Sequence, residues 1–180
     1  MLLLSACADH GALLQDKLDP VTAVTITYCQ TPFVFYRDDT GKAAFARDYV
    51  HVAPLEVNRT GDFRYYIWLG IWDTLQDTDA GNASGSFESI VIFADGEPLS
   101  LDLSGWLPAA IGASEPVYIK PVSSATDAYY EVTIDQLRLI AEASDLRLQS
   151  TGPKQQSYEL WDHQTSARAS LYKFLGKSVY

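Results

Sequence analysis

From about Val21 to Val132 the sequence alternates short runs of β-branched and aromatic residues with turn residues. This alternation predicts short strands, which we expect at 22–29, 32–37, 43–57, 62–73, 87–94, 97–103, 116–122 and 127–132. Two turns, Asp38-Asp39-Thr40-Gly41 and Asp95-Gly96, place residues that tolerate positive φ between apolar runs, as a tight hairpin requires. Most of the chain therefore favours an antiparallel β structure.

In two of these segments the residue pattern predicts which faces of the strand are buried. Leucine alternates with Ser or Asp over 97–103, which indicates one buried and one solvated face. Segment 62–73 is apolar on both faces, with Phe63, Tyr65, Ile67, Leu69 and Ile71 on one and Tyr66, Trp68 and Trp72 on the other. Tyr66, Trp68 and Trp72 are therefore a possible binding surface, and core packing is the alternative.

After Thr133 the pattern acquires a helical period, and Thr133 with Gln136 has the spacing of a capping box. Strands are expected through Leu148 and near 158–161, followed by a second helix that contains Leu171. These elements predict an α+β fold that is mainly antiparallel β. We expect a curved sheet or sandwich of about ten strands with two C-terminal helices packed on it.

The charge balance restricts the class of partner. The chain has 13 basic and 23 acidic residues and a formal net charge of −10, with no run of Lys or Arg. Nucleic acid requires a positive surface, so we expect no nucleic-acid partner.

Sequence motifs for catalysis or cofactor binding are missing. The histidines, His10, His51 and His163, are too far apart to predict a metal site, and no nucleophile, phosphate-loop or dinucleotide motif occurs. We therefore expect no metal, no cofactor and no catalytic residue. The alternative is a hydrolase that uses loop carboxylates, for which the candidates are Asp73, Asp77, Asp79 and Glu88.

The quartet Leu4-Ser5-Ala6-Cys7 resembles the lipobox of a bacterial lipoprotein. In such proteins the signal is cut before the cysteine, which carries the lipid. The resemblance implies three segments: a residual signal sequence at 1–6, a lipidation site at Cys7 with a tether to residue 20, and a single β-rich globular domain at 21–180. Cys29 is then left without a disulfide partner, and we expect it to be a buried small hydrophobe.

The residue after Cys7 is Ala8 rather than aspartate. By the same resemblance, this implies attachment to the outer membrane, facing the periplasm. We expect contact with the membrane through the lipid only. The expected function is a non-catalytic binding or accessory module for another envelope protein or a cell-wall component, with a periplasmic hydrolase as the alternative.

Overall fold

The computed structural model describes residues 13–177 apart from 42, 76–85, 154 and 163. The predicted lipidation site at Cys7 and the predicted signal segment at 1–6 lie outside the described residues. The described strands, in chain order, are β1 Leu14–Leu18, β2 Thr25–Cys29, β3 Phe33–Asp38, β4 Arg47–Arg59, β5 Asp62–Asp73, β6 Ser89–Ala94, β7 Glu97–Gly105, β8 Thr126–Val132, β9 Leu146–Ser150 and β10 Gln156–Leu160. The helices are α2 Ile134–Glu142, α3 Thr165–Lys177 and a short 3₁₀ helix at Pro108–Ile111.

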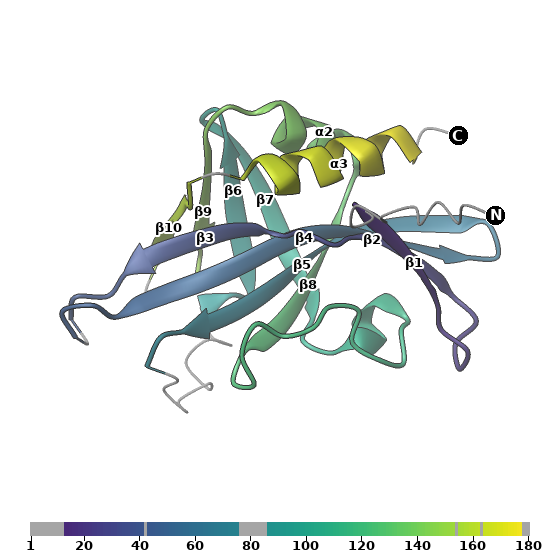
Figure 1. Cartoon of the computed structure of the whole chain (residues 1–180), viewed down its shortest axis with the longest axis horizontal. Helices are drawn as coiled ribbons and strands as arrows, with labels where there is room; N and C mark the ends of the chain where they lie inside the picture. The colour runs from purple at the N-terminus through teal and green to yellow at the C-terminus, as the bar shows by residue number, and fades with distance from the viewer. Residues whose placement is uncertain (1–12, 42, 76–85, 154, 163, 178–180) are drawn as a thin grey trace, which may run out of the picture.

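Eight of the strands form a closed antiparallel barrel in the order β4-β3-β10-β9-β6-β7-β8-β5 (Figure 1). The α+β class, the mainly antiparallel sheet and the two late helices are as predicted. The sandwich alternative is wrong, because the curved sheet closes on itself: β5 pairs with β4 on one side and with β8 on the other. Closure removes the two free edges that an open sheet would expose.

A two-stranded extension leaves the barrel along β4. The first half of β4 pairs with β3, and the second half pairs with β2, which pairs in turn with β1. Residues 14–18 therefore form a strand rather than the predicted tether. Only Leu14 and Leu18 of this strand are apolar, so its sequence carries little strand signal, and the strand is specified by pairing with β2 in the register Leu14↔Cys29 to Leu18↔Thr25.

The other difference lies between β7 and β8. Residues 116–122 are not a strand, because Pro116 and Pro121 lack the amide hydrogens that a sheet requires. They belong to the covering segment, which we define as Trp106–Ala125. This segment contains the 3₁₀ helix and lies below the long strands in Figure 1, on the outer face of the barrel.

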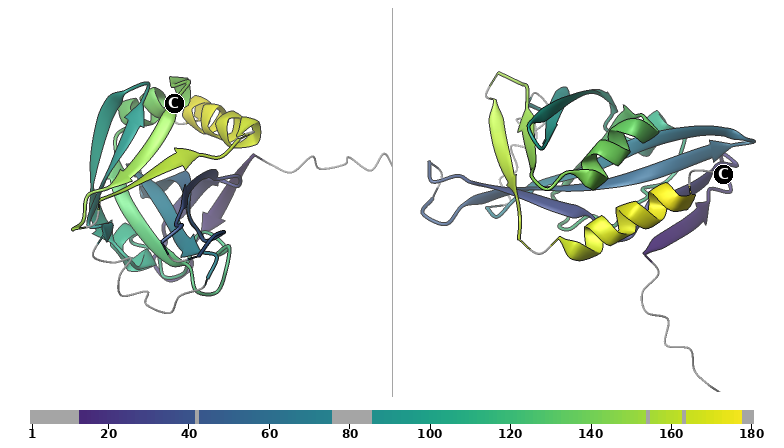
Figure 2. Two further views of the ribbon diagram at one scale, coloured as in Figure 1. Left: turned by 90° about the vertical axis from the view of Figure 1, so that its left-hand side faces the viewer. Right: turned by 90° about the horizontal axis from the view of Figure 1, so that it is seen from above.

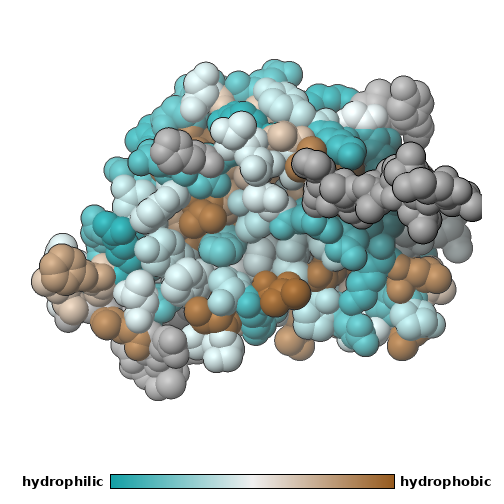
Figure 3. Space-filling view, in the orientation of Figure 1, coloured by the Kyte–Doolittle hydropathy of each residue, from teal (hydrophilic) through white to brown (hydrophobic). Residues whose placement is uncertain are grey.

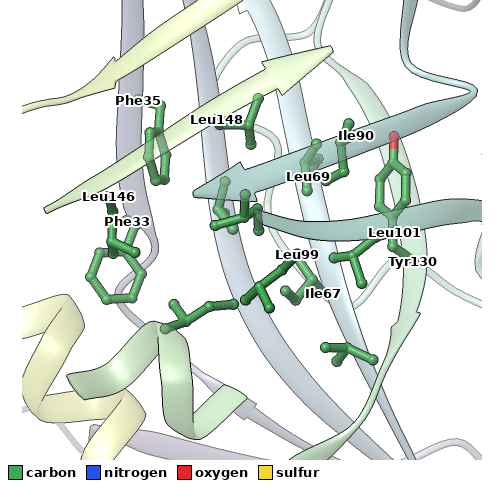
Figure 4. Packing of buried hydrophobic residues seen from close by; sticks show 14 of the residues in the cluster. Phe33, Phe35, Ile67, Leu69, Ile90, Leu99, Leu101, Tyr130, Leu146 and Leu148 are labelled. Atoms are coloured by element: carbon green, nitrogen blue, oxygen red, sulfur yellow. The ribbon is translucent and has the colours of Figure 1, made fainter. Parts of the chain in front are cut away.

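Apolar side chains fill the interior of the barrel (Figure 4). Alternate residues of each strand point inward, and those labelled in the close-up are Phe33, Phe35, Ile67, Leu69, Ile90, Leu99, Leu101, Tyr130, Leu146 and Leu148. The leucine alternation of β7 is confirmed, with Leu99 and Leu101 buried and Ser100 exposed. Cys29 is a buried free thiol, as predicted, and burial raises its pKa to about 12.

Both helices pack over one end of the barrel, and they lie next to each other in the view from above (Figure 2). Helix α2 begins with the predicted capping box, in which Thr133 and Gln136 satisfy each other's backbone amides. Leu137 and Ile140 of α2 and Leu171 and Phe174 of α3 complete the interior core at this end. The helices therefore seal the barrel rather than line an opening.

Candidate functional site

Side chains of the described strands fill the interior of the barrel. An eight-stranded barrel is just wide enough either for side chains or for one small ligand. Here aromatic and aliphatic residues occupy the space, including Phe35, Phe87, Tyr130 and Tyr158, all of which are fully buried. This filling directs attention to the outer surface of the barrel.

The structure divides the three aromatic residues that the sequence offers as a possible binding surface. Tyr66 and Trp68 are buried beneath the covering segment, and only 1% of Trp68 is exposed. The Trp68 ring stacks on Tyr118 with 4.3 Å between centroids, and its Nε1 donates a hydrogen bond to Asp127 at 3.0 Å. Core packing therefore describes Tyr66 and Trp68. Trp72 lies beyond the covering segment and is only half-buried.

Trp72 belongs to a different group on the outer wall, which we call the aromatic face and define as Tyr36, Tyr49, Trp72 and Trp161. Strand register produces most of it, because Tyr36 pairs with Tyr49 and Tyr49 pairs with Trp72 across β3, β4 and β5. The Tyr49 and Trp72 rings stack at 4.5 Å, and the Tyr36 ring meets the edge of Trp161 at 5.0 Å. Each ring thus supports its neighbour across the barrel wall.

Trp161 completes the aromatic face from the end of β10. Its backbone amide donates to the carbonyl of Val34 at 2.8 Å, and the Val34 amide donates to Oε1 of Gln164 at 3.2 Å. These two bonds continue the β3–β10 seam, where the strands themselves pair at only Glu159↔Tyr36 and Leu160↔Phe35. The indole is therefore fixed beside β3 and remains 38% exposed.

Arg47 and His51 lie against the rings of the aromatic face. The guanidinium of Arg47 lies 5.4 Å from the ring centroids of both Tyr36 and Trp161, within cation–π range, and pairs with Asp38 at 2.7 Å. The His51 ring meets Trp72 edge-on, and burial lowers its pKa, so the imidazole is neutral at neutral pH. The Nε1 of Trp72 is buried without a hydrogen-bond partner in the described part of the chain.

A cleft of about 630 Å³ adjoins the aromatic face at Trp161. This volume is within the range typical of small-molecule sites, roughly 300–1,000 Å³. The cleft lies where the first turns of α3 meet the connection from α2 to β9. Its lining residues come from that connection, the end of β10 and α3: Ser144, Asp145, Leu146, Leu160, Trp161, Asp162, Gln164, Thr165, Arg168, Ala169 and Tyr172.

Of the carboxylates considered for a hydrolase, the two that the structure describes, Asp73 and Glu88, do not line this cleft. Asp73 ends β5 opposite Asp48, which is ion-paired with Arg37, and Glu88 is exposed just before β6. Asp77 and Asp79 lie outside the described residues, so the hydrolase alternative stays a prediction. Among the described residues, no three His, Cys, Asp or Glu side chains are grouped so that they could hold a metal ion.

Sequence reasoning found one member of the aromatic face, Trp72, and missed Tyr36, Tyr49 and Trp161. The register of β3, β4 and β5 brings Tyr36, Tyr49 and Trp72 together, and the distant β10 adds Trp161. No pattern within one strand shows this grouping. Within the described residues, no helix is long and apolar enough to cross a membrane. Comparison of the chain with protein-family models, with curated proteins and with solved structures finds no match.

Proposed function

We propose that this protein is a lipid-anchored lipoprotein of the bacterial cell envelope that binds another envelope protein or a cell-wall component without catalysis. The aromatic face carries this proposal. Partly exposed Trp and Tyr side chains are typical anchors of binding interfaces, because they bury a large area and lose little conformational entropy. The filled barrel supports the same function, since it leaves the outer wall as the surface on which recognition occurs.

The packing of the aromatic face favours binding by a preformed surface. Tyr49 stacks on Trp72, Tyr36 meets Trp161 edge-on, and Arg47 contacts Tyr36 and Trp161. A side chain held in this way has little freedom to lose when a partner arrives, so more of the contact energy remains as affinity. The face of the molecule seen in Figure 3 mixes hydrophilic and apolar residues and shows no single broad apolar patch.

The placement of the chain start is compatible with an anchor. Strand β1 pairs with β2 beside the second half of β4, whereas Tyr49 lies near the first residue of β4. At roughly 3.3 Å per residue, the pairing region and Tyr49 are separated by about 25 Å. A lipid on Cys7 would join the domain through β1, which pairs with β2 and does not contribute to the aromatic face.

Lipidation at Cys7 is tested by mass spectrometry and membrane fractionation of the full chain in a bacterium with two membranes. The expected result is a Cys7 peptide that carries diacylglycerol, together with recovery of the protein in the outer-membrane fraction. The Cys7→Ser variant is expected to be released from the membrane. An unmodified Cys7 peptide would overturn the proposed anchoring.

Binding by the aromatic face is tested by crosslinking in cells, with a photoreactive phenylalanine analogue in place of Tyr49. We expect one discrete envelope molecule, identified by mass spectrometry, whose yield falls in Trp72→Ala and in Cys7→Ser. The analogue in place of Phe63 is the matched control, because Phe63 is a 49% exposed aromatic residue at the other end of β5. Equal products from both positions would show that the aromatic face has no specific partner.

A further inference from the structure

We propose that the cleft beside Trp161 binds a neutral carbohydrate, whose pyranose rings stack on Trp161 and Tyr172 while their hydroxyl groups bond to the polar side chains of the wall. This inference rests on the proposed function. Of the two partner classes proposed there, an envelope protein and a cell-wall component, it selects the cell-wall component. The cleft and the aromatic face then form one continuous site that shares Trp161.

Two exposed aromatic rings line the cleft. Trp161 is 38% exposed and Tyr172 is 51% exposed, and they come from the end of β10 and from the middle of α3. Trp161 is held from the barrel side by Tyr36, Tyr49 and Arg47. A pyranose presents apolar C–H groups on its faces and hydroxyl groups around its rim, so an aromatic ring beside polar side chains matches both parts of it.

The charged side chains that line the cleft favour a ligand without net charge. Asp145 and Asp162 oppose an anion. The guanidinium of Arg168 and the ion pair of Asp145 with Arg147, at 3.5 Å, offset these two carboxylates. Nη1 of Arg168 also already donates to the carbonyls of Ala141 at 2.9 Å and Ala143 at 2.5 Å, so it is not free to bind an anion. A cation is opposed by Arg168 itself and by Arg47, which already contacts the Trp161 ring.

The polar side chains of the wall exclude a purely apolar ligand. Such a ligand would strip water from the carboxylates of Asp145 and Asp162 without replacing the lost hydrogen bonds, which is costly. A polyhydroxyl ligand replaces them, because each hydroxyl can donate to a carboxylate or accept from an amide. Gln164 and Thr165 add further groups that can bond to hydroxyls at the start of α3.

The inference is tested by binding of the full 180-residue chain to an array of neutral α- and β-linked pyranose oligosaccharides. Tri-N-acetylchitotriose is the first probe, and calorimetry gives the Kd of each array member that binds. We expect saturable binding that weakens about tenfold or more in Trp161→Ala and in Asp162→Asn. Phe63→Ala, an exposed aromatic change away from the cleft, is expected to bind like the wild type. Asp162→Asn replaces an exposed side chain of nearly equal size, so it separates loss of binding from loss of folding.

The outcomes separate this inference from the proposed function. The carbohydrate site is overturned if no oligosaccharide of the array binds, or if binding is unchanged in Trp161→Ala and Asp162→Asn. If no oligosaccharide binds while a photoreactive analogue in place of Tyr172 captures an envelope protein, the carbohydrate inference fails and the proposed binding function stands. If the array and the Tyr172 crosslinking find no ligand and the Tyr49 crosslinking gives no product, both the carbohydrate inference and the proposed function fail.

Discussion

Two stacked Trp–Tyr pairs lie on the outer face of β5, with nearly the same geometry and different surroundings. The rings of Trp68 and Tyr118 are 4.3 Å apart at an interplanar angle of 20°, and those of Trp72 and Tyr49 are 4.5 Å apart at 17°. The first pair is buried and its indole Nε1 bonds to Asp127, whereas the second is half-buried and its indole Nε1 has no described partner. The same contact therefore belongs to the core in one place and to a half-buried part of the outer wall in the other.

The covering segment makes this difference. It is fixed to the barrel by the Tyr118 hydroxyl, which donates to the Pro54 carbonyl at 2.9 Å, and by Lys120, which lies 3.6 Å from Asp127. It is also fixed to the β1–β2 turn, because Asp19 accepts hydrogen bonds from the backbone and the hydroxyl of Ser114. Trp68 packs with residues of this segment and Trp72 is not in that cluster, so the position of one loop decides which pair is buried and which stays half-buried.

The largest expected effect comes from removing the covered indole. Trp68→Ala deletes a buried ring and leaves Asp127 without its indole donor, so we expect a loss of about 3–5 kcal/mol in the free energy of unfolding. Trp72→Ala is expected to lose about 1 kcal/mol, because part of that ring is already in water. Urea unfolding of both variants measures the difference. Equal losses would contradict the assignment of the two pairs to different roles.

A smaller effect is expected from Gly70→Ala, which adds a methyl group at the border between the pairs. The new Cβ would lie 2.6 Å from the Trp68 ring, and that ring cannot move aside easily because Tyr118 and Asp127 hold it. We expect a loss of about 1–3 kcal/mol from overpacking. Gly176→Ala is the matched control, since nothing lies within 4 Å of its added Cβ. A neutral Gly70→Ala in urea unfolding would show that the covered ring is loosely held.

The attachment of the covering segment to the β1–β2 turn is expected to weaken in acid. The backbone amide of Ser114 is the main cause that lowers the pKa of Asp19, with the Ser114 hydroxyl and the amides of Thr22 and Val21 adding to it against the effect of burial. An unfolded aspartate has a pKa of about 3.9. Because the folded pKa is lower, the stabilisation is complete above the unfolded value and is lost as the pH falls through the folded one.

Asp19→Asn is therefore expected to lower the Tm at pH 7, and the gap between this variant and the wild type is expected to narrow at pH 3. Thermal unfolding followed by circular dichroism at both pH values gives the gap. Asp102→Asn, at an exposed position on β7, controls for the general effect of removing a carboxylate. A gap of the same size at both pH values would show that Asp19 does not stabilise the fold through its charge.

The sequence predicted the elements whose signal is local. The leucine alternation of β7 and the capping box at Thr133 depend on residues within a few positions of each other, and both are confirmed. The strand 62–73 was also predicted with its observed bounds, because its run of aromatic and β-branched residues is long. Apolar residues at 117–119 carry the same local signal, but the flanking prolines prevent a strand, and Val117 and Tyr118 pack with Trp68 and Tyr66 from a loop.

Closure and the candidate site could not be predicted in the same way, because both depend on pairings between distant segments. The register Tyr49↔Trp72 follows from the whole β4–β5 hairpin, and Trp161 reaches the same wall from more than eighty residues away. Nor does the sequence of β5 show which of its outward tryptophans the covering segment reaches. A one-face pattern identifies aromatic residues on a strand, but their exposure is decided by a loop whose path has no periodic signal.

The smallest effect on stability is expected from Trp72→Phe, which gives the sharpest comparison with the same change at Trp68. Trp72→Phe removes an indole N–H that has no described partner and keeps an aromatic ring over Tyr49, so we expect the free energy of unfolding to change by less than about 0.5 kcal/mol. Trp68→Phe removes an N–H that bonds to the buried Asp127, and we expect a loss of about 1–3 kcal/mol. Urea unfolding of the two variants compares the same chemical change in the two surroundings. If Trp72→Phe proved as destabilising as Trp68→Phe, the uncovered indole would be part of the core. If Trp72→Phe kept its stability and lost the Tyr49 crosslink, the N–H of Trp72 would be a group that the partner satisfies.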